Sequence, residues 1–173
     1  MPDLIRHPDR GKFNSFERQQ RRVLIIIMRI YIDTCGIQRP LDTKNQMRII
    51  LEADAILGLL EFCKGDQADL ITSDILRFEI RNCQNIVRRE YAEDVLKKAG
   101  TNVLLTDKIR ARALELEGLG FRGIDALHLA SAEAGNADFF CTCDDGIIKK
   151  AKSEKLSKIK VLSPIDLIKE LKL

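Results

Sequence analysis

The chain has 173 residues, of which 45% are hydrophobic and 32% charged, so it can bury one sizeable core and is too apolar to be disordered. Aromatic residues make up 5% and Trp is absent, which excludes a surface that binds single strands mainly by stacking bases on many rings. The net charge of +3 is carried entirely by residues 1–27, where six Lys or Arg residues face three acids. Residues 28–173 are therefore neutral, and would bind a polyanion only through local patches or bound cations.

Two explanations compete for the basic segment at residues 1–27. It could be an arm that contacts nucleic acid, or translation could begin at Met28, which directly precedes the first strong strand pattern. We expect the second, so that residues 1–27 are an extension that is not part of the native protein and residues 28–173 form the folded domain. The longest apolar run, residues 23–28, is much shorter than the ~20 residues of a membrane span, so we expect no membrane association.

The cysteine pattern indicates a cytoplasmic protein with reduced thiols. There are five cysteines, an odd number, and their spacing matches no disulfide scaffold. Cys141 and Cys143 lie in an expected strand and share one face. No second cysteine pair or nearby His completes a tetrahedral zinc site, so we expect no structural zinc.

From Met28 onward, strand patterns alternate with helical patterns. The expected strands are residues 29–32, 70–72, 102–105, 138–142 and 161–162. The expected helices are residues 45–64, 74–83, 85–98, 107–116, 124–134, 146–152 and 165–171. This alternation predicts an α/β fold, a three-layer α/β/α sandwich with a central parallel sheet of four to five strands. In such sheets, ligands bind beyond the carboxyl ends of the strands.

Acidic residues follow two of the expected strands. Asp33 comes directly after the first strand, and Asp144 and Asp145 follow Thr142 at the end of the fourth. Each residue taken alone is explained by the preference of Asp for turns and helix starts. Parallel strands, however, would bring both positions to the same edge of the sheet.

Two further acids lie on expected helices. Glu79 shares a helix face with Leu76 and Ile80 and needs a partner there, because burying an unpaired charge is costly; Arg77 or Arg81 could supply it. Asp125 opens the helix 124–134, where the helix dipole alone would favour an acid. The functional case rests on the conjunction of Asp33, Glu79, Asp125 and Asp144. Carboxylates gathered in one pocket repel one another, and a hard divalent cation such as Mg²⁺ removes that penalty.

The sequence gives little support for a catalytic triad or for a nucleotide-binding fold. His7 lies in the basic segment, and His128 follows Asp125 on one helix face, where it is either packed or in touch with the metal shell. A Ser–His–acid triad would have to use His128, and no G-x-S-x-G elbow occurs. The glycine-rich phosphate-binding loops of nucleotide-binding folds are also absent.

Four motifs resemble those of the PIN-domain family, and VapC-like toxins in particular. The run I-Y-I-D at residues 30–33, followed by Thr34, is similar to the first motif, and S-D-I-L-R-F-E-I at 73–80 to the second. The run I-D-A-L-H-L-A-S-A at 124–132 is the most specific match, and F-F-C-T-C-D-D-G at 139–146 resembles the fourth. The resemblance covers residues 28 to about 165.

The resemblance implies a Mg²⁺- or Mn²⁺-dependent endoribonuclease, a hydrolase that leaves a 5′-phosphate and a 3′-hydroxyl. It further implies the toxin of a toxin–antitoxin pair, with RNA as substrate, an antitoxin protein as partner and a homodimeric state. The family's acidic quartet corresponds here to Asp33 and Asp144 as central ligands, Glu79 as a ligand or water-orienting group, and Asp125 as a ligand of the same or a second ion. The candidate supporting residues are Thr142, Asp145 and Thr34.

Rival interpretations remain open. One is a non-catalytic PIN-like domain that binds RNA or protein. Another is a phosphohydrolase with Asp33 as nucleophile, although Cys35 stands where such enzymes have a second acid. The candidate RNA-contacting residues are Arg39, Arg77, Arg81, Arg88 and Arg89, which a charged helix surface explains equally well.

Overall fold

The chain folds around one sheet in which every neighbouring strand pair is parallel. The computed structural model describes residues 27–65, 67–156 and 158–173, so the expected extension lies, but for Ile27, outside the described residues. The strands, in the sheet order β3-β2-β1-β4-β5, are β3 (Thr101–Val103), β2 (Ala68–Ser73), β1 (Met28–Ile32), β4 (Phe139–Cys141) and β5 (Lys160–Leu162). The predicted parallel sheet is confirmed.

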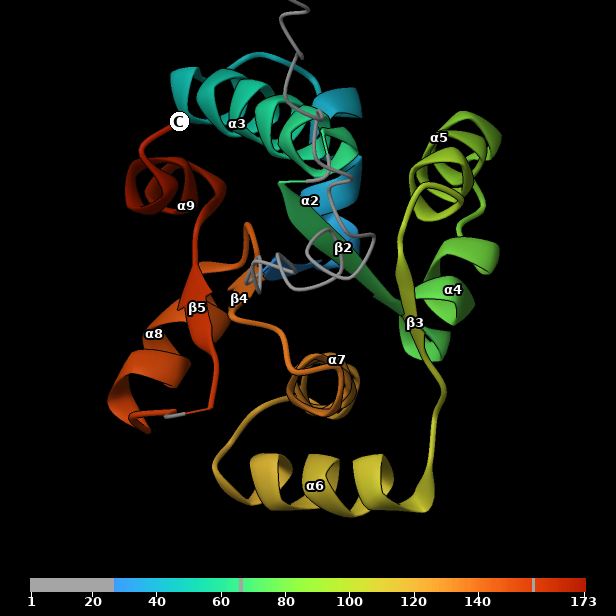
Figure 1. The fold of residues 1–173 in the computed structure, drawn as a ribbon, viewed down its shortest axis with the longest axis vertical. Coiled ribbons are helices and arrows are strands. Elements are labelled where there is room, and N and C mark those ends of the chain that lie inside the picture. The colour runs from blue at the N-terminus through green and yellow to red at the C-terminus, as the bar shows by residue number, and fades with distance from the viewer. Residues whose placement is uncertain (1–26, 66, 157) are drawn as a thin grey trace, which may run out of the picture.

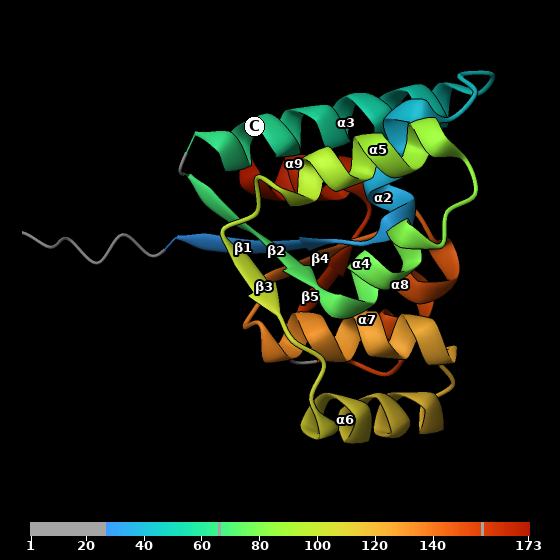
Figure 2. The same cartoon turned by 90° about the vertical axis from the view of Figure 1, so that its right-hand side faces the viewer.

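Helices cover both faces of this sheet. They are α2 (Thr34–Gln38), α3 (Met47–Lys64), α4 (Asp74–Arg81), α5 (Ile86–Leu96), α6 (Asp107–Gly118), α7 (Gly123–Ala134), α8 (Asp145–Ser153) and α9 (Pro164–Leu171), with a 3₁₀ turn, η1, at Arg39–Leu41. In Figures 1 and 2, α3, α5 and α9 lie on one side of the sheet and α7 on the other, with α6 packed outside α7. This is the three-layer sandwich that the alternating pattern predicts.

The central strand shows why the sequence folds this way. Ile30, Tyr31 and Ile32 are completely buried, as expected for a parallel strand that is covered by helices on both faces. Several of the helices begin at side-chain caps. Ser73 and Thr106, for example, accept hydrogen bonds from backbone N–H groups in the first turns of α4 and α6.

Two local features differ from the predicted pattern. The short helix α2 and the turn η1 were not predicted, because five and three residues are too few for a helical period to show. The third strand was predicted at residues 102–105 but spans Thr101–Val103. After Val103 the chain leaves the ladder, so that Leu104 is exposed and the N–H of Leu105 donates to Asp74 instead.

The strand order places a topological switch between β1 and β4. The chain runs from β1 through β2 to β3 on one side, and then returns to place β4 on the other side of β1. The pairing continues past the strand ends, since the N–H of Asp33 donates to the carbonyl of Cys141 at 3.1 Å. Ligands of open α/β sheets bind at such a switch, beyond the carboxyl ends of the strands.

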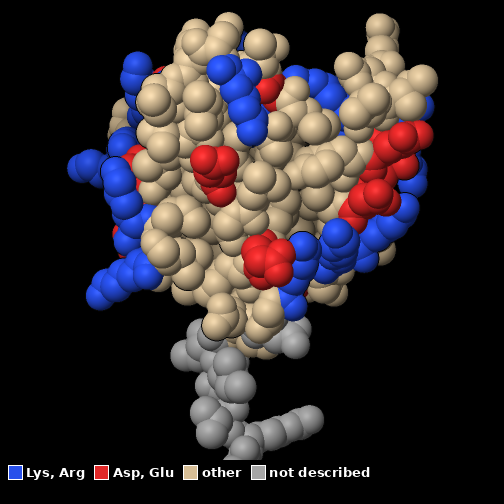
Figure 3. All heavy atoms as spheres, turned by 90° about the horizontal axis from the view of Figure 1, so that it is seen from above, with Lys and Arg blue, Asp and Glu red and all other residues tan. Residues whose placement is uncertain are grey.

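The face built on α3 is poor in charge. Figure 3 shows much of this face uncharged, with Lys and Arg mostly toward the rim and a few acidic side chains within the face. The α3 residues Met47, Leu51 and Leu57 are exposed by 69%, 49% and 46%, although large apolar side chains usually lie inside. None of the described helices is sufficiently long and apolar to span a bilayer.

Candidate active site

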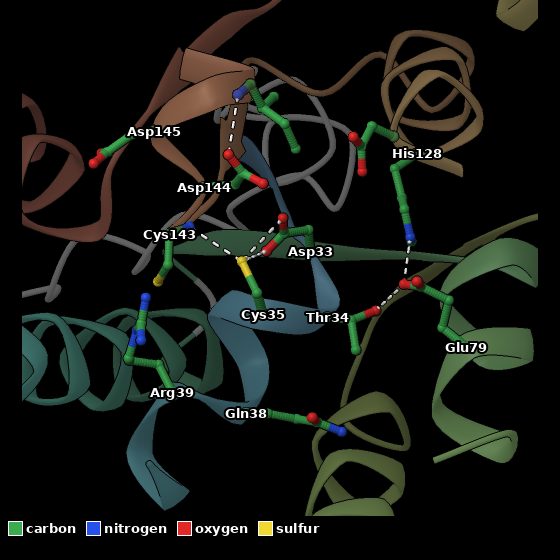
Figure 4. A pocket seen from close by; sticks show the side chains of 12 residues that line it. Asp33, Thr34, Cys35, Gln38, Arg39, Glu79, His128, Cys143, Asp144 and Asp145 are labelled. Carbon is green, nitrogen blue, oxygen red and sulfur yellow. Dashed lines mark hydrogen bonds and ion pairs between the residues drawn. The ribbon is translucent and has the colours of Figure 1, made fainter. Parts of the chain in front are cut away.

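The four acids singled out in the sequence line one cavity at the carboxyl edge of the sheet. Asp33 follows β1, and Asp144 is the N-cap of α8. Glu79 comes from α4, and Asp125 from the first turn of α7. The cavity has a volume of ≈ 580 Å³, and Figure 4 shows Asp33, Glu79 and Asp144 directed toward its centre. Its other lining residues are Thr34, Cys35, Gln38, Arg39, His128, Cys143, Asp145 and Ile147.

Asp33 lies deepest in this cavity, with 6% of its surface exposed. Its Oδ1 accepts a hydrogen bond from the N–H of Gly36 at 2.9 Å and so caps α2. The thiol of Cys35 donates to the carboxylate oxygens, at 3.1 and 3.3 Å. Burial, followed by the neighbouring Cys35, raises the pKa of Asp33 well above its ordinary value. The helix-start explanation therefore accounts for one oxygen of Asp33, but not for its burial.

Gly36 allows Asp33 to hold this position. A Cβ atom at residue 36 would lie 2.7 Å from Cγ2 of Ile32 and 3.2 Å from Oδ1 of Asp33. Both distances are shorter than ordinary van der Waals contact, so any side chain here would displace the strand end or the carboxylate.

Glu79 is held by a buried chain of polar side chains. Its Oε2 accepts hydrogen bonds from the Thr34 hydroxyl and from Nε2 of His128, the latter at 2.7 Å. The other ring nitrogen of His128, Nδ1, lies 2.7 Å from the hydroxyl of Tyr31. That hydroxyl in turn lies 2.7 Å from Oγ of Ser73, which caps α4. The helix that carries Glu79 is thus tied to the strand that ends at Asp33.

The environment of Glu79 favours its charged form. Burial alone would raise the pKa of Glu79, but the hydrogen bond and charge of His128, together with the Thr34 hydroxyl, leave this pKa below its ordinary value. The partner is thus His128, and not Arg77 or Arg81 as the sequence allowed. His128 itself is 3% exposed, so it is both packed in the interior and joined to the site.

Asp125 has no hydrogen bond or ion pair within the described residues. The N-cap of its helix is Arg122, which makes no side-chain capping bond. Burial, and then the negative charge of Asp144, raise the pKa of Asp125. The helix-dipole explanation is therefore incomplete, because Asp125 lies close enough to a second carboxylate to be disfavoured as an anion.

Asp144 combines a structural bond with a free oxygen. Its Oδ1 accepts hydrogen bonds from the N–H groups of Gly146 and Ile147, at 2.6 and 3.3 Å. Its own N–H donates to the Thr142 hydroxyl at 3.0 Å, so Thr142 orients the turn. The capping explanation again covers only one oxygen, and Oδ2 has no partner within the described residues.

Asp145 faces away from the centre of the site. Both of its carboxylate oxygens accept hydrogen bonds from the guanidinium of Arg48, at 2.7 Å each, and Figure 4 shows the side chain turned outward. The hydrogen bonds from Arg48 lower the pKa of Asp145. Arg48 also bonds the buried Glu52 at 2.7 Å, and Glu52 lies 3.0 Å from Arg39.

Among the arginines proposed to contact RNA, only Arg39 lines the cavity. Its guanidinium is engaged by Asp42 at 2.8 Å as well as by Glu52. Arg88 is also bound by Asp42, at 2.6 Å. The other three lie outside the cavity: Arg77 bonds Asn102, Arg89 bonds a carbonyl, and Arg81 is exposed.

The donor atoms around the cavity fit a hard divalent cation. Carboxylates dominate, and Thr34 and Thr142 add hydroxyl oxygens nearby; oxygen is the ligand type that Mg²⁺ and Mn²⁺ prefer. Within residues 27–65, 67–156 and 158–173, no three His, Cys, Asp or Glu side chains lie close enough to hold one ion by themselves. Mg²⁺ keeps several waters and commonly takes one or two carboxylates plus substrate phosphate.

The sequence did not single out several residues of this site. Cys143 and Gln38 line the cavity, and Glu52 anchors the arginines beside it. Glu52 carried a usable signal, since it stands among the apolar residues of the α3 pattern and, like Glu79, needs a buried partner. Gln38 follows the short helix α2, which has no visible period.

Comparison with known proteins supplies the family. The sequence pattern of the PIN domain matches residues 30–153, which is more than two thirds of the chain. The chain belongs to the PIN-domain family. No relative was found among curated proteins.

Solved structures also match this chain. A chain in the crystal structure of VapBC2 from Rickettsia felis, bound to a DNA fragment from their promoter, aligns with a TM-score of 0.53 at 16% identity. The alignment covers 79% of this PIN domain protein and 98% of that chain. At this identity the likeness supports the fold only.

Proposed function

We propose that this PIN-domain protein is a Mg²⁺- or Mn²⁺-dependent endoribonuclease that acts as the toxin of a toxin–antitoxin pair. One observation carries the proposal: acids from four separate segments, Asp33, Glu79, Asp125 and Asp144, line a single cavity at the switch point of the sheet. PIN domains are generally nucleases, which supports the hydrolase class.

In this proposal, Asp33 and Asp144 hold the ion, each through the oxygen that does not cap a helix. Asp125 is a ligand of the same or a second ion, and Glu79 is a ligand or orients the attacking water. When bound, the ion lowers the pKa of a water and stabilises negative charge on the attacked phosphate and the leaving oxygen. His128 and Thr34 keep the Glu79 carboxylate oriented and charged, while Thr142 orients the turn that carries Asp144.

The test is cleavage of a defined RNA by purified protein with Mg²⁺, with Mn²⁺ and with EDTA. We expect metal-dependent cleavage that leaves 5′-phosphate and 3′-hydroxyl ends. Asp33→Asn should abolish cleavage while keeping the cap of α2, because Asn is as good an N-cap as Asp. Equal cleavage by the wild type and Asp33→Asn would reject the proposed site, and RNA binding without cleavage would favour a non-catalytic PIN domain.

The toxin assignment extends to partners and domain limits. The VapBC2 neighbour supports an antitoxin partner. Met47 and Leu51, exposed apolar residues one turn apart on α3, support an interface with that partner or with a second copy. A gene for a small DNA-binding protein directly upstream, and sedimentation of the purified chain, test these two assignments. We assign the nuclease domain to residues 28–173 and a cytoplasmic location to the protein; N-terminal analysis of native protein tests the start.

A further inference from the structure

A second, smaller hollow adjoins the acid-lined cavity. It lies between the α6–α7 turn and α8, has a volume of ≈ 210 Å³ and shares Asp125, Asp144 and Ile147 with the larger cavity. The residues found only in this hollow are Gly120, Phe121, Arg122, Gly146 and Lys150. A chain that crosses the acids from the larger cavity therefore continues into a hollow that contains two cationic side chains.

These two cations differ from the other basic groups around the site. Within the described part of the chain, neither the guanidinium of Arg122 nor Nζ of Lys150 has a hydrogen-bonding or ion-pair partner, whereas Arg39 and Arg48 on the far side of the cavity are both held by acids. Arg122 lowers the pKa of Asp125, but burial and Asp144 outweigh it. Arg122 and Lys150 therefore remain available to bind an anionic ligand.

The backbone keeps the ammonium group of Lys150 accessible. Gly120 has a φ of 89°, a conformation that L side chains rarely adopt. A Cβ atom at residue 120 would lie 3.0 Å from Nζ of Lys150 and 3.5 Å from Cε. Glycine at this turn leaves room beside the head group of Lys150, which lines the hollow.

We infer that Arg122 and Lys150 form a phosphate subsite that holds the sugar–phosphate backbone of single-stranded RNA next to the bond that is cleaved. The inference rests on the proposed nuclease function and names where its substrate lies. Single-stranded nucleic acid is held by cationic grooves that follow the backbone. Of the described Lys and Arg residues that line the two cavities, Arg122 and Lys150 are the two without a partner. The earlier candidates Arg77, Arg88 and Arg89 are engaged elsewhere.

The test compares two double variants that remove the same charge. Arg122→Ala/Lys150→Ala removes the subsite. The control, Arg110→Ala/Lys149→Ala, removes an exposed arginine on α6 and the lysine next to Lys150 on α8, neither of which lines either cavity. Both are placed in the Asp33→Asn background, so that binding of a labelled single-stranded RNA can be measured by anisotropy in Mg²⁺ without cleavage. Thermal unfolding checks that each variant folds.

We expect the subsite variant to bind RNA about tenfold more weakly, and the slope of log K against log salt to fall by about 1 to 2 relative to the control. In the active background, the same variant should raise KM and leave kcat nearly unchanged. If the two double variants bind equally, or if no RNA binds, the subsite is rejected. Cleavage of RNA by the wild type is measured separately. If the wild type cleaves RNA and the two double variants bind RNA equally, only the subsite is rejected. If RNA binding depends on Arg122 and Lys150 but the wild type does not cleave RNA, the subsite is supported and the nuclease function is rejected.

Discussion

Nε2 of His128 lies 2.7 Å from Oε2 of Glu79, although the two residues are 49 positions apart in the sequence. The contact joins α7 to α4 across the cavity, and Tyr31 holds the opposite ring nitrogen. Because Glu79 accepts the bond, Nε2 carries the proton and the imidazole acts as a donor. His128 is thus a positioning residue for the Glu79 carboxylate.

Replacing His128 should therefore impair metal use more than folding. Partners that orient metal ligands are typically worth about 10- to 100-fold in metal affinity or activity, and we expect a loss of this size in His128→Leu, which removes the donor and keeps a bulky side chain. The measurement is the Mg²⁺ concentration required for half-maximal RNA cleavage. His128→Gln retains an N–H donor and should recover part of the loss; equal Mg²⁺ requirements in both variants would show that only packing matters.

Asp33→Asn should stabilise the protein in the absence of metal. The folded-state pKa of Asp33 lies above its unfolded value, so the folded protein binds more protons than the unfolded chain between these values, and the free energy of unfolding falls as pH rises through that window. The Asn variant avoids this loss. Its melting temperature in EDTA should exceed that of the wild type at neutral pH, and the difference should vanish below about pH 4, the ordinary pKa of Asp.

Magnesium provides the matching control for that experiment. An ion that binds only the folded state raises the free energy of unfolding by about 2.7 kcal/mol at 100 times its dissociation constant. Mg²⁺ should therefore raise the melting temperature of the wild type and have a smaller effect on Asp33→Asn. A wild type that is indifferent to Mg²⁺ over the range that supports cleavage would contradict Asp33 as a ligand.

The adjacent acids Asp144 and Asp145 should respond very differently to the same substitution. Asp145 is turned outward and held by Arg48, in an exposed ion pair of a type worth about 0–1 kcal/mol. Asp145→Asn should change the cleavage rate by less than about fivefold. Asp144→Asn should reduce it by about 100-fold or more, comparable to removing a major electrostatic contact of a transition state. Similar losses in the two variants would contradict these assignments.

Glu52 should matter for stability rather than for chemistry. It is 1% exposed and forms ion pairs with Arg48 and Arg39, and breaking a buried ion pair costs about 3–5 kcal/mol. We expect Glu52→Ala to lower the free energy of unfolding in urea by an amount of that order. Asp54→Ala, an exposed acid on the same helix, should be nearly neutral, and an equally small effect at Glu52 would show that the arginines stabilise no buried charge.

The sequence predicts most of this fold because its elements carry long, regular patterns. Eighteen residues of α3 and twelve of α7 show a clear helical period or apolar run, and β1 is bounded by Asp33. The segment that follows is different. Helix α2 depends on Gly36 fitting beneath Ile32 and on the carboxylate of Asp33, and both are tertiary facts that leave no periodic trace.

Some features of the candidate site can likewise be predicted from the sequence, and others cannot. The identities of the four acids can be predicted, because each stands at a strand end or on an inward helix face. Their hydrogen bonds cannot be predicted. The partner of Glu79 is His128 and not the nearby Arg77 or Arg81, because the packing of α4 against α7 sets it. Whether Arg122 and Lys150 form ion pairs depends on which acids the tertiary packing brings close to them, and the spacing of residues in the sequence does not predict this.

The place of β4 beside β1 also governs when the site can exist. A ribosome releases Asp33 and Glu79 early, but Asp144 follows a strand that pairs directly with β1 and emerges only after residue 138. Until then the central strand lacks a neighbour on one side, and the nascent chain holds three of the four acids but lacks Asp144. Under the proposed nuclease function, a truncated translation product that ends before β4 lacks both Asp144 and the strand that positions it, and should not cleave RNA.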